Sequence, residues 1–397
     1  MSEFNSYNEL EIILTDEDYN NHFVNNSVLL LSSPIPLVLL VFPGTIIDLR
    51  PGKKRVICSL TYQGFETGVT KLSKVLRKYV DAGHYFEQIY ILGTTEAALD
   101  MGGNFLGFIE RILRFTRSRC PDTKFIFMNG DMNAKRNVRE YTELNNIDFA
   151  HIDCCGFPFG LLSRTRRRLT RLNQGDITMD YNSPTAKHFI CMNASENHSR
   201  LKLLDNLHET NVIDKCYWSW LRRHADEDND MVLQDISRGF FDFRQTKELD
   251  LTLGQLEFED NQDTVDNFYY LTDSLIDIGV ETDARYQFIT EKTWKPLLYG
   301  KVSLFLQGEN YHSDVLTSLG FELYDEIFDY SFDKISDEWY RFRAYCKELK
   351  RVSEIPIEEL QKKIISIEDK ITRNRNHAWN CDILVHPLFK EYPTLLP

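Results

Sequence analysis

The sequence lacks the glycine fingerprints with which the commonest nucleotide-binding folds hold phosphates. In its 397 residues no GxGxxG follows a strand-like run, and no GxxxxGK[ST] occurs. The chain has eight cysteines but no CxxC pair, and most of them lie in apolar, strand-like runs. The missing glycine motifs argue against a dinucleotide-binding site of the GxGxxG type and against a P-loop. The second predicts reduced core cysteines and no metal, because zinc ligands would have to come from distant parts of the chain.

Long hydrophobic runs are also missing. The most apolar stretch, Val28–Phe42, is interrupted by two serines and two prolines, so it is too broken to cross a bilayer. The N-terminus carries early acidic residues and no basic segment of the kind that opens a secretory signal. We therefore expect a cytoplasmic protein without a membrane span.

Charge of one sign is absent from most of the chain. Residues 225–283 hold 17 Asp and Glu against three bases, which accounts for the whole net charge of -14. Outside this segment acidic and basic residues are equal in number, so the composition predicts neither a generally basic nucleic-acid binder nor a generally acidic protein. One basic cluster stands out, formed by Arg164, Arg166, Arg167, Arg168 and Arg171.

The first half of the chain alternates between strand-like and helix-like patterns. The expected strands are Arg55–Tyr62, Gln88–Thr94, Lys124–Asn129 and Ile147–Cys154. The expected helices are Val69–Tyr79, Phe105–Arg117, Lys135–Asn145 and a helix from about Leu161 to Leu172. Such alternation is typical of a parallel sheet with crossover helices, which binds ligands at the carboxyl ends of its strands.

A polar stretch, Asn173–Thr185, interrupts the alternation, which then restarts. The expected strands are now Lys187–Met192, Asn267–Thr272, Val302–Leu306 and Phe321–Tyr324, and the expected helices are Ser199–Thr210, Thr290–Leu298, Ser313–Leu319, Ser336–Val352 and Ile357–Thr372. We therefore expect an N-terminal sheet domain over residues 1–178, a second sheet domain over 186–335, and a C-terminal helical segment over 336–397.

The most informative segment is RYQFITEKTWKPLLYGKVSLFLQG, from Arg285 to Gly308. Thr290 can cap a helix whose first turn holds Glu291 and Lys292. Free N–H groups and the partial positive charge at such a helix start suit a diphosphate, and Lys292 adds a full charge. A carboxylate such as Glu291 can accept two ribose hydroxyls. The simpler alternative is that both residues are solvated charges of a first helical turn.

This segment, extended back to NFYYLTDSL, resembles the donor-site motif of the α1,3-fucosyltransferase family, with its Thr–Glu–Lys at a helix start followed by a glycine and a strand. YHSDVLTSLGFELYDE is similar to the continuation in viral members, and KHFICMNASENHSRLKLLDNL to the strand, loop and helix that open their nucleotide-binding domain. The family's asparagine-bearing strand end is replaced by LTDSLIDIG, so the sugar cannot be carried over.

The resemblance implies an α/β protein of GT-B fold, with two Rossmann-like domains facing a cleft and C-terminal helices. It implies a nucleotide-diphosphate sugar as donor, with no metal or other cofactor. On the matching positions, Arg200 and Lys292 would meet the diphosphate, Glu291 the ribose and Tyr286 the nucleotide. Thr290 would cap the helix, and Asn193 would stand where the first strand ends at the donor.

An inverting transferase needs a carboxylate to take the acceptor's proton. Five carboxylates occupy expected strand ends in the N-terminal half: Glu66, Glu96, Asp100, Asp131 and Asp153. Glu96 and Asp100 are favoured because they precede the pair Gly102–Gly103, where a backbone can approach a ligand closely.

The arginine-rich helix admits two interpretations. Its members at spacing i, i+3, i+4 and i+7 are Arg164, Arg167, Arg168 and Arg171, which would form one basic face. This face could grip phosphates of a nucleic acid or an anionic glycan, or simply pair with the acidic segment.

The sequence thus predicts an inverting, metal-independent glycosyltransferase. Its acceptor is either a glycan or a hydroxymethylated base in virus-type DNA, in which case the protein would work in a host cytoplasm. The sequence distinguishes neither UDP from GDP nor one sugar from another. The alternative is a non-catalytic nucleotide-binding or interaction module on a transferase fold.

Overall fold

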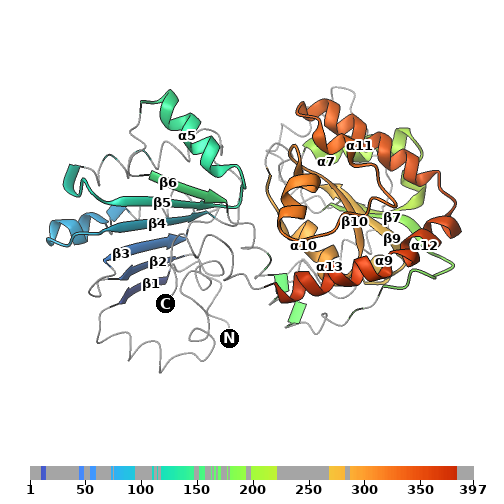
Figure 1. The fold of residues 1–397 in the computed structure, drawn as a ribbon, viewed down its shortest axis with the longest axis horizontal. Coiled ribbons are helices and arrows are strands. Elements are labelled where there is room, and N and C mark those ends of the chain that lie inside the picture. Colours follow the sequence, from blue (N-terminus) through green and yellow to red (C-terminus); the bar gives the residue numbers. More distant parts are fainter. Residues whose placement is uncertain are drawn as a thin grey trace, which may run out of the picture. The chain divides into compact units, whose positions relative to one another are not determined.

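The computed structural model describes most of the second half of the chain and parts of the first. The described residues are 10–14, 44–48, 54–59, 73–74, 76–93, 110, 114, 118–146, 152–156, 162, 165–166, 169–170, 177, 179–193, 198–220, 268–281 and 287–381. The chain divides into two compact units (Figure 1). The N-terminal unit is Met1–Arg168 with Asp382–Pro397, and the C-terminal unit is Leu169–Cys381.

The described strands of the N-terminal unit form a six-stranded sheet in the order β1-β2-β3-β4-β5-β6. They are β1 (Leu10–Leu14), β2 (Gly44–Asp48), β3 (Arg55–Ser59), β4 (Gln88–Gly93), β5 (Lys124–Asn129) and β6 (Ile152–Gly156). Only the pairing of β2 with β3 is antiparallel within this sheet. β5 is apolar on both faces, with Phe125 to Met128 all buried, as expected of a parallel strand under crossover helices. Helix α5 (Ala134–Leu144) connects β5 to β6.

The C-terminal unit contains a four-stranded parallel sheet in the order β10-β9-β7-β8. Its strands are β7 (Lys187–Asn193), β8 (Cys216–Trp220), β9 (Ser274–Val280) and β10 (Val302–Leu306). From β7 the chain moves to one side for β8 and to the other for β9 and β10. The carboxyl ends of β7 and β9 therefore flank a topological switch point, the position where open α/β sheets bind ligands.

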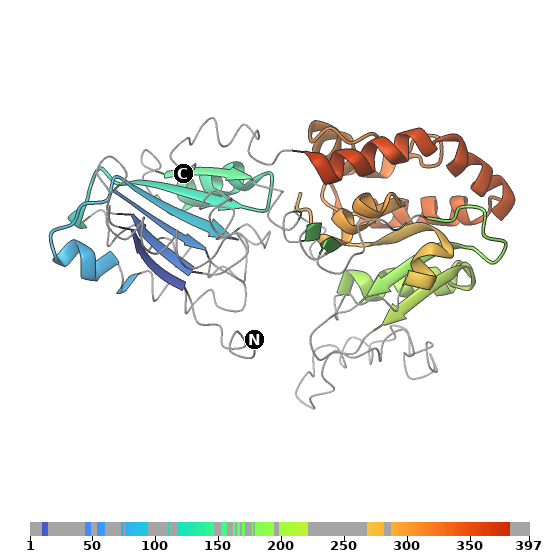
Figure 2. The ribbon, with the colours of Figure 1, turned by 90° about the horizontal axis from the view of Figure 1, so that it is seen from below.

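Helices cover this sheet and share its core (Figure 2). The α-helices are α7 (His198–Glu209), α9 (Phe268–Thr272), α10 (Glu291–Tyr299), α11 (Glu338–Ser353), α12 (Ile357–Ser366) and α13 (Glu368–Asn380). Shorter turns are η2 (Ile213–Lys215), the π-helical η5 (Tyr311–Leu316) and η6 (Tyr330–Lys334). Buried residues of β7, β9 and β10 form one apolar cluster with residues of α7, α11, α12 and α13.

Helix α13 holds the C-terminal end of α10. The indole Nε1 of Trp379 donates to the carbonyl of Leu298 at 2.8 Å, and Nε of Arg375 reaches the same carbonyl at 3.3 Å. Gly300 ends α10 in the left-handed region at φ 69°, and a Cβ there would approach Cδ of Arg375 to 3.0 Å. The last carbonyls of α10 are thus satisfied by a neighbouring helix and by a glycine cap.

The α/β class is confirmed, with pairings that are parallel except between β2 and β3, but the strand expected at Asn267–Thr272 is wrong. Asn267–Thr272 was expected to be a strand because aromatic residues favour strands. The structure instead has helix α9 there, and the strand that follows, β9, is central, with six of its seven residues buried. The apolar run Ser274–Val280 fills a position between two parallel neighbours, and this burial outweighs the propensity of the aromatic run.

Two further expectations also fail. Phe321–Tyr324 is not a strand: the N–H and carbonyl of Glu322 bond to the side chain of Asn374 at 2.9 and 2.8 Å rather than to a neighbouring strand. Ile357–Thr372 is not one helix but two, α12 and α13. They meet at Ile367, whose side chain is buried in the core.

The unit boundaries differ from the expected domains. The division falls after Arg168, not after residue 178, and Tyr181 from the expected linker is buried, donating to the carbonyl of Gly300 at 2.8 Å. Helices α11–α13 are part of the C-terminal unit rather than a separate segment, because their apolar faces complete its core. No helix among the described residues is long and apolar enough to cross a membrane.

The placement of α11 in the core can be tested at Tyr345. Its buried hydroxyl lies 3.0 Å from the carbonyl of Gly279 and 2.9 Å from that of Leu304, and accepts the Gly279 N–H at 3.2 Å. Tyr345→Phe should lower the free energy of unfolding by about 1–3 kcal/mol, because buried backbone groups lose a partner. Tyr340→Phe, at a 62% exposed position of the same helix, should be neutral in the same urea titration. Equal effects of the two would contradict this packing.

Candidate functional site

The candidate site lies at the carboxyl ends of β7 and β9. Asn193 is the last residue of β7, and Glu281 follows β9 directly. The next helices along the chain, α7 and α10, bring Arg200 and the Thr290–Lys292 segment in their first turns. Strand order therefore gathers residues that are far apart in the sequence at one sheet edge.

Thr290 caps α10 as expected. Its backbone is extended, with φ -101° and ψ -176°, and its Oγ1 accepts the N–H of Lys292 at 3.2 Å. This bond satisfies one of the N–H groups that a helix leaves free at its start. Thr290 is 2% exposed, so the cap is shielded from water.

The residue that organises this edge is Glu281, which the sequence analysis missed. Its carboxylate is fully buried. Oε1 accepts the N–H of Thr290 at 3.1 Å and the hydroxyl of Thr293 at 2.9 Å, while Oε2 accepts the Thr290 hydroxyl. A signal for it existed, because an acidic residue directly after the apolar run SLIDIGV marks the carboxyl end of a strand. Placing the strand at Asn267–Thr272 hid that signal.

Lys292 lies among carboxylates and a hydroxyl. Its Nζ is 3.3 Å from Oε1 of Glu291, 3.8 Å from Oε2 of Glu281 and 3.3 Å from Oγ1 of Thr290. Burial acts to raise the pKa of the Glu291 carboxyl, but the charges of Lys292 and Lys295 outweigh it and hold that pKa at about 2. The side chain of Glu291 is 43% exposed, so part of it remains accessible to solvent beside the lysine.

Arg200 belongs to the same charge cluster. Its side chain comes from the first turn of α7 and is buried at 3% exposure. Burial lowers the pKa of the guanidinium, and the negative charges of Glu281 and Glu291 oppose that shift. Arg200 and Lys292 therefore lie in the field of the same two carboxylates, so the structure brings together three of the expected donor-site residues.

Asn193 is buried at the same edge, and its Nδ2 donates to Sγ of Cys191 at 3.4 Å. Burial raises the pKa of that thiol to about 12, so Cys191 is a neutral core residue, as expected for the cysteines. No group of three or more His, Cys, Asp or Glu among the residues with a described placement could hold a metal ion.

Several expected site residues lie outside the described residues: Glu66, Glu96, Asp100, Arg164, Arg167, Arg168, Arg171 and Tyr286. In the arginine-rich helix the structure describes Leu162, Thr165 and Leu169, which are buried at helical spacing, together with the half-buried Arg166 and the exposed Thr170.

Two of the weaker candidates for the catalytic base are engaged elsewhere. Asp131 is fully buried and accepts the N–H of Asn133 at 2.9 Å and Nδ2 of Asn137 at 2.7 Å, so it stabilises the start of α5. Asp153 was expected at a carboxyl end, but β6 begins at Ile152 and places it near the amino end. There its carboxylate lies 3.4 Å from Nζ of Lys124.

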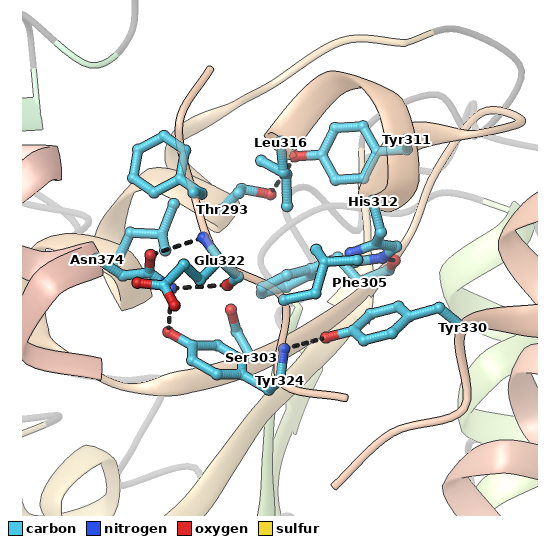
Figure 3. A pocket seen from close by; sticks show the side chains of 13 residues that line it. Thr293, Ser303, Phe305, Tyr311, His312, Leu316, Glu322, Tyr324, Tyr330 and Asn374 are labelled. Atoms are coloured by element: carbon cyan, nitrogen blue, oxygen red, sulfur yellow. Dashed lines mark hydrogen bonds between the residues drawn. The ribbon is translucent and has the colours of Figure 1, made fainter. Parts of the chain in front are cut away.

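A small cavity is lined by residues of α10, β10, η5 and the segment Phe321–Tyr324 (Figure 3). Thr293 and Tyr311 are among its lining residues, and a hydrogen bond of 2.9 Å joins their hydroxyls. Its volume of about 20 Å³ has room for a single water molecule and not for a nucleotide. The cavity is therefore too small to be the nucleotide site.

Comparisons with known proteins assign no family. No protein-family model matches the chain, and a search of curated proteins found no match. A mutant of BGT from phage T4 in complex with UDP-glucose is 11% identical, with 74% of each chain covered and a TM-score of 0.28. UDP-GlcNAc 2-epimerase from Neisseria meningitidis bound to UDP-GlcNAc is 12% identical over 92% of this chain and 91% of that one, with a TM-score of 0.30.

The catalytic domain of starch synthase IV from Arabidopsis thaliana bound to ADP and acarbose is 9% identical. The similarity covers 78% of this chain and 77% of the starch synthase domain, with a TM-score of 0.31. These similarities are too low to assign an activity to this chain. The resemblance to the α1,3-fucosyltransferase group stays an expectation.

His312, which lines the cavity, predicts a pH dependence of stability. Its ring is buried beside Tyr330 and Phe332, and Nε2–H donates to the carbonyl of Phe305 at 2.9 Å. Burial lowers its pKa below the ordinary 6.5, although Asp333 opposes the shift. As the pH falls below about 6.5 the unfolded chain binds the proton first. This group's contribution is therefore complete above that pH and is lost below it, at up to about 1.4 kcal/mol per pH unit.

Urea titrations at pH 7.5, 6.0 and 5.0 check this expectation. His312→Asn should remain folded at pH 7.5 and lose less stability on acidification than the wild type. An unchanged slope in the variant would show that His312 is not the group that titrates.

Proposed function

We propose that this protein is a GT-B glycosyltransferase that binds a nucleotide-diphosphate sugar at the switch point of its C-terminal unit. The observation that carries the proposal is the convergence of Arg200 and Lys292, from two different helices, on one sheet edge. Two cations beside a capped helix start make an environment for a diphosphate, which carries negative charge and accepts N–H donors.

Within this proposal Arg200 and Lys292 balance the diphosphate, and Glu291 accepts the two ribose hydroxyls. The low pKa of Glu291 supports its part, because an ionised carboxylate only accepts hydrogen bonds and so selects hydroxyl donors. Tyr286 would line the nucleotide, and Asn193 would meet the donor at the end of β7. In the structure Nζ of Lys292 contacts Oε1 of Glu291. A bound diphosphate would therefore have to replace part of this contact.

The reaction we propose is an inverting transfer without a resident metal. A carboxylate of the N-terminal unit, Glu96 or Asp100, takes the proton of the acceptor hydroxyl. The acceptor oxygen then bonds to the anomeric carbon, and the nucleoside diphosphate leaves with the electron pair of the broken bond. Arg200 and Lys292 would stabilise the charge that develops on the leaving diphosphate.

The acceptor is either a glycan or a hydroxymethylated base in virus-type DNA, and the two predict different roles for the arginine-rich helix. For DNA the arginines at 164, 167, 168 and 171 would contact phosphates. For a glycan the same face would instead pair with acidic side chains of the protein.

A second candidate function is a nucleotide-binding or interaction module without catalysis. Titration calorimetry with UDP and GDP divides this candidate in two. A nucleotide-binding module still binds UDP or GDP, whereas an interaction module that has lost the site binds neither. Hydrolysis of a nucleotide sugar by the wild type would favour the enzyme.

The donor site predicts the effect of Lys292→Ala. The variant should bind UDP or GDP about 1–3 kcal/mol more weakly, the scale of a charge-assisted hydrogen bond. The fold should survive because the lysine side chain is 21% exposed in a first turn. Lys347→Ala, an exposed charge on α11, is the matched control and should leave calorimetric affinity unchanged. Unaltered affinity in folded Lys292→Ala would refute the site.

The DNA acceptor, if correct, predicts that binding weakens as the salt concentration rises. If the arginine face binds DNA, replacing Arg167 and Arg168 with Ala should flatten the log–log salt dependence of binding by up to about two units. Donor hydrolysis without acceptor should stay intact. Transfer assays on hydroxymethylated DNA and on oligosaccharides compare the two acceptors. Transfer to oligosaccharide alone, insensitive to the double variant, would exclude the DNA acceptor.

A further inference from the structure

A chain of buried hydroxyls runs from the cavity to the candidate site. The Thr293 hydroxyl donates to the carboxyl oxygen Oε1 of Glu281 at 2.9 Å. Thr293 has a single hydroxyl proton, so in its contact of 2.9 Å with Tyr311 the tyrosine must be the donor (Figure 3). The hydrogen bonds therefore all run in one direction: Tyr311 donates to Thr293, and Thr293 donates to Glu281.

The same carboxylate orients the cap of α10. The Thr290 hydroxyl donates its one proton to Oε2 of Glu281, so its lone pairs are left for the N–H and the Nζ of Lys292, at 3.2 and 3.3 Å. The Thr290 N–H also bonds to Oε1. Glu281 thus determines both where the first turn of α10 begins and which way its cap faces.

Burial makes these bonds hard to replace. Glu281 and Tyr311 are fully buried, and Thr290 and Thr293 are each 2% exposed. Water cannot take over a missing donor at such positions without rearrangement, and linked hydrogen bonds in a dry environment strengthen one another. Loss of the Thr293 hydroxyl should therefore change the position of Lys292, although none of these hydrogen bonds joins the two residues directly.

We propose that Glu281 is a positioning residue of the site, which through Thr290 and Thr293 holds the first turn of α10 and Lys292 in the orientation that binds a diphosphate. This inference rests on the proposed function only for the identity of the ligand. The positioning itself concerns α10 and can be measured without any ligand.

Two substitutions at Thr293 separate positioning from packing. Thr293→Val keeps the shape and removes the hydroxyl, whereas Thr293→Ser keeps the hydroxyl and removes a methyl group beside the cavity. UDP and GDP are the probes, titrated calorimetrically into each folded variant. We expect Thr293→Ser to keep the wild-type affinity although it loses thermal stability, and Thr293→Val to bind about tenfold more weakly. Equal affinity losses in both variants, or none in Thr293→Val, would overturn the proposal.

Hydrogen exchange measures the same positioning without a nucleotide. In Thr293→Val the amides of Thr290 and Lys292 should exchange about tenfold faster than in Thr293→Ser, while those near Leu298, held by α13, should not change. Equal exchange in the two variants would overturn the inference. If the wild type binds neither UDP nor GDP, the proposed ligand is wrong, but the exchange comparison still decides the role of Glu281.

Glu281→Gln adds a direct test where it folds, because it removes the charge and changes only one atom. It should show the weaker nucleotide binding of Thr293→Val. Glu322→Gln, which removes a carboxylate paired with Arg373 at the surface, is the control and should bind like the wild type. Wild-type affinity in folded Glu281→Gln would contradict the proposal.

Discussion

A buried carboxylate must be balanced by donors and cations, and Glu281 satisfies that requirement with the groups that make up the candidate site. An ionised carboxylate without partners would be very costly in an apolar interior. Here it receives two hydroxyls and one backbone N–H, and Lys292 lies 3.8 Å away. The start of α10 and the cap at Thr290 are bonded to this carboxylate at the end of β9, and Arg200 lies in the field of Glu281 together with Glu291.

The two ends of α10 are held by different parts of the same unit. At its N-terminus the N–H of Thr290 is bonded to Glu281, and its C-terminal carbonyl at Leu298 is bonded by Trp379 and Arg375 of α13. Helix α13 is in turn attached to the turn around Glu322 through Asn374. The C-terminal helices therefore contribute to the site indirectly, since they fix the far end of the helix whose first turn would meet the ligand.

Strand order explains why the charges meet. Arg200 and Lys292 lie far apart in the sequence, but β7 and β9 are neighbours and parallel, so the helices that follow them start at the same edge. The chain leaves β7 in opposite directions for β8 and β9, so the ends of β7 and β9 form the kind of switch point at which open α/β sheets bind ligands. The cations at this edge are the feature on which the proposed diphosphate site rests.

Much of this could be predicted from local patterns. The apolar runs of β5 and β10 and the helix of α10 stood where the sequence indicated, because buried parallel strands and a Thr–Glu–Lys helix start have distinct local signatures. The α/β class and the pairing of Thr290 with the Lys292 N–H followed from the same signatures.

Local propensity by itself left two rival positions for β9, and the choice between them was decided only by the tertiary structure. The aromatic run before Ser274 favours a strand locally, and only the competition for the centre of the sheet assigned that place to Ser274–Val280 and made Glu281 the residue at the ligand edge. The partners of Glu281 come from one loop and helix, but its burial and its proximity to Arg200 need β7, α7 and α10 in place. Local sequence carries propensities and caps, whereas burial and charge balance are properties of the assembled unit, and so only the tertiary structure could decide them.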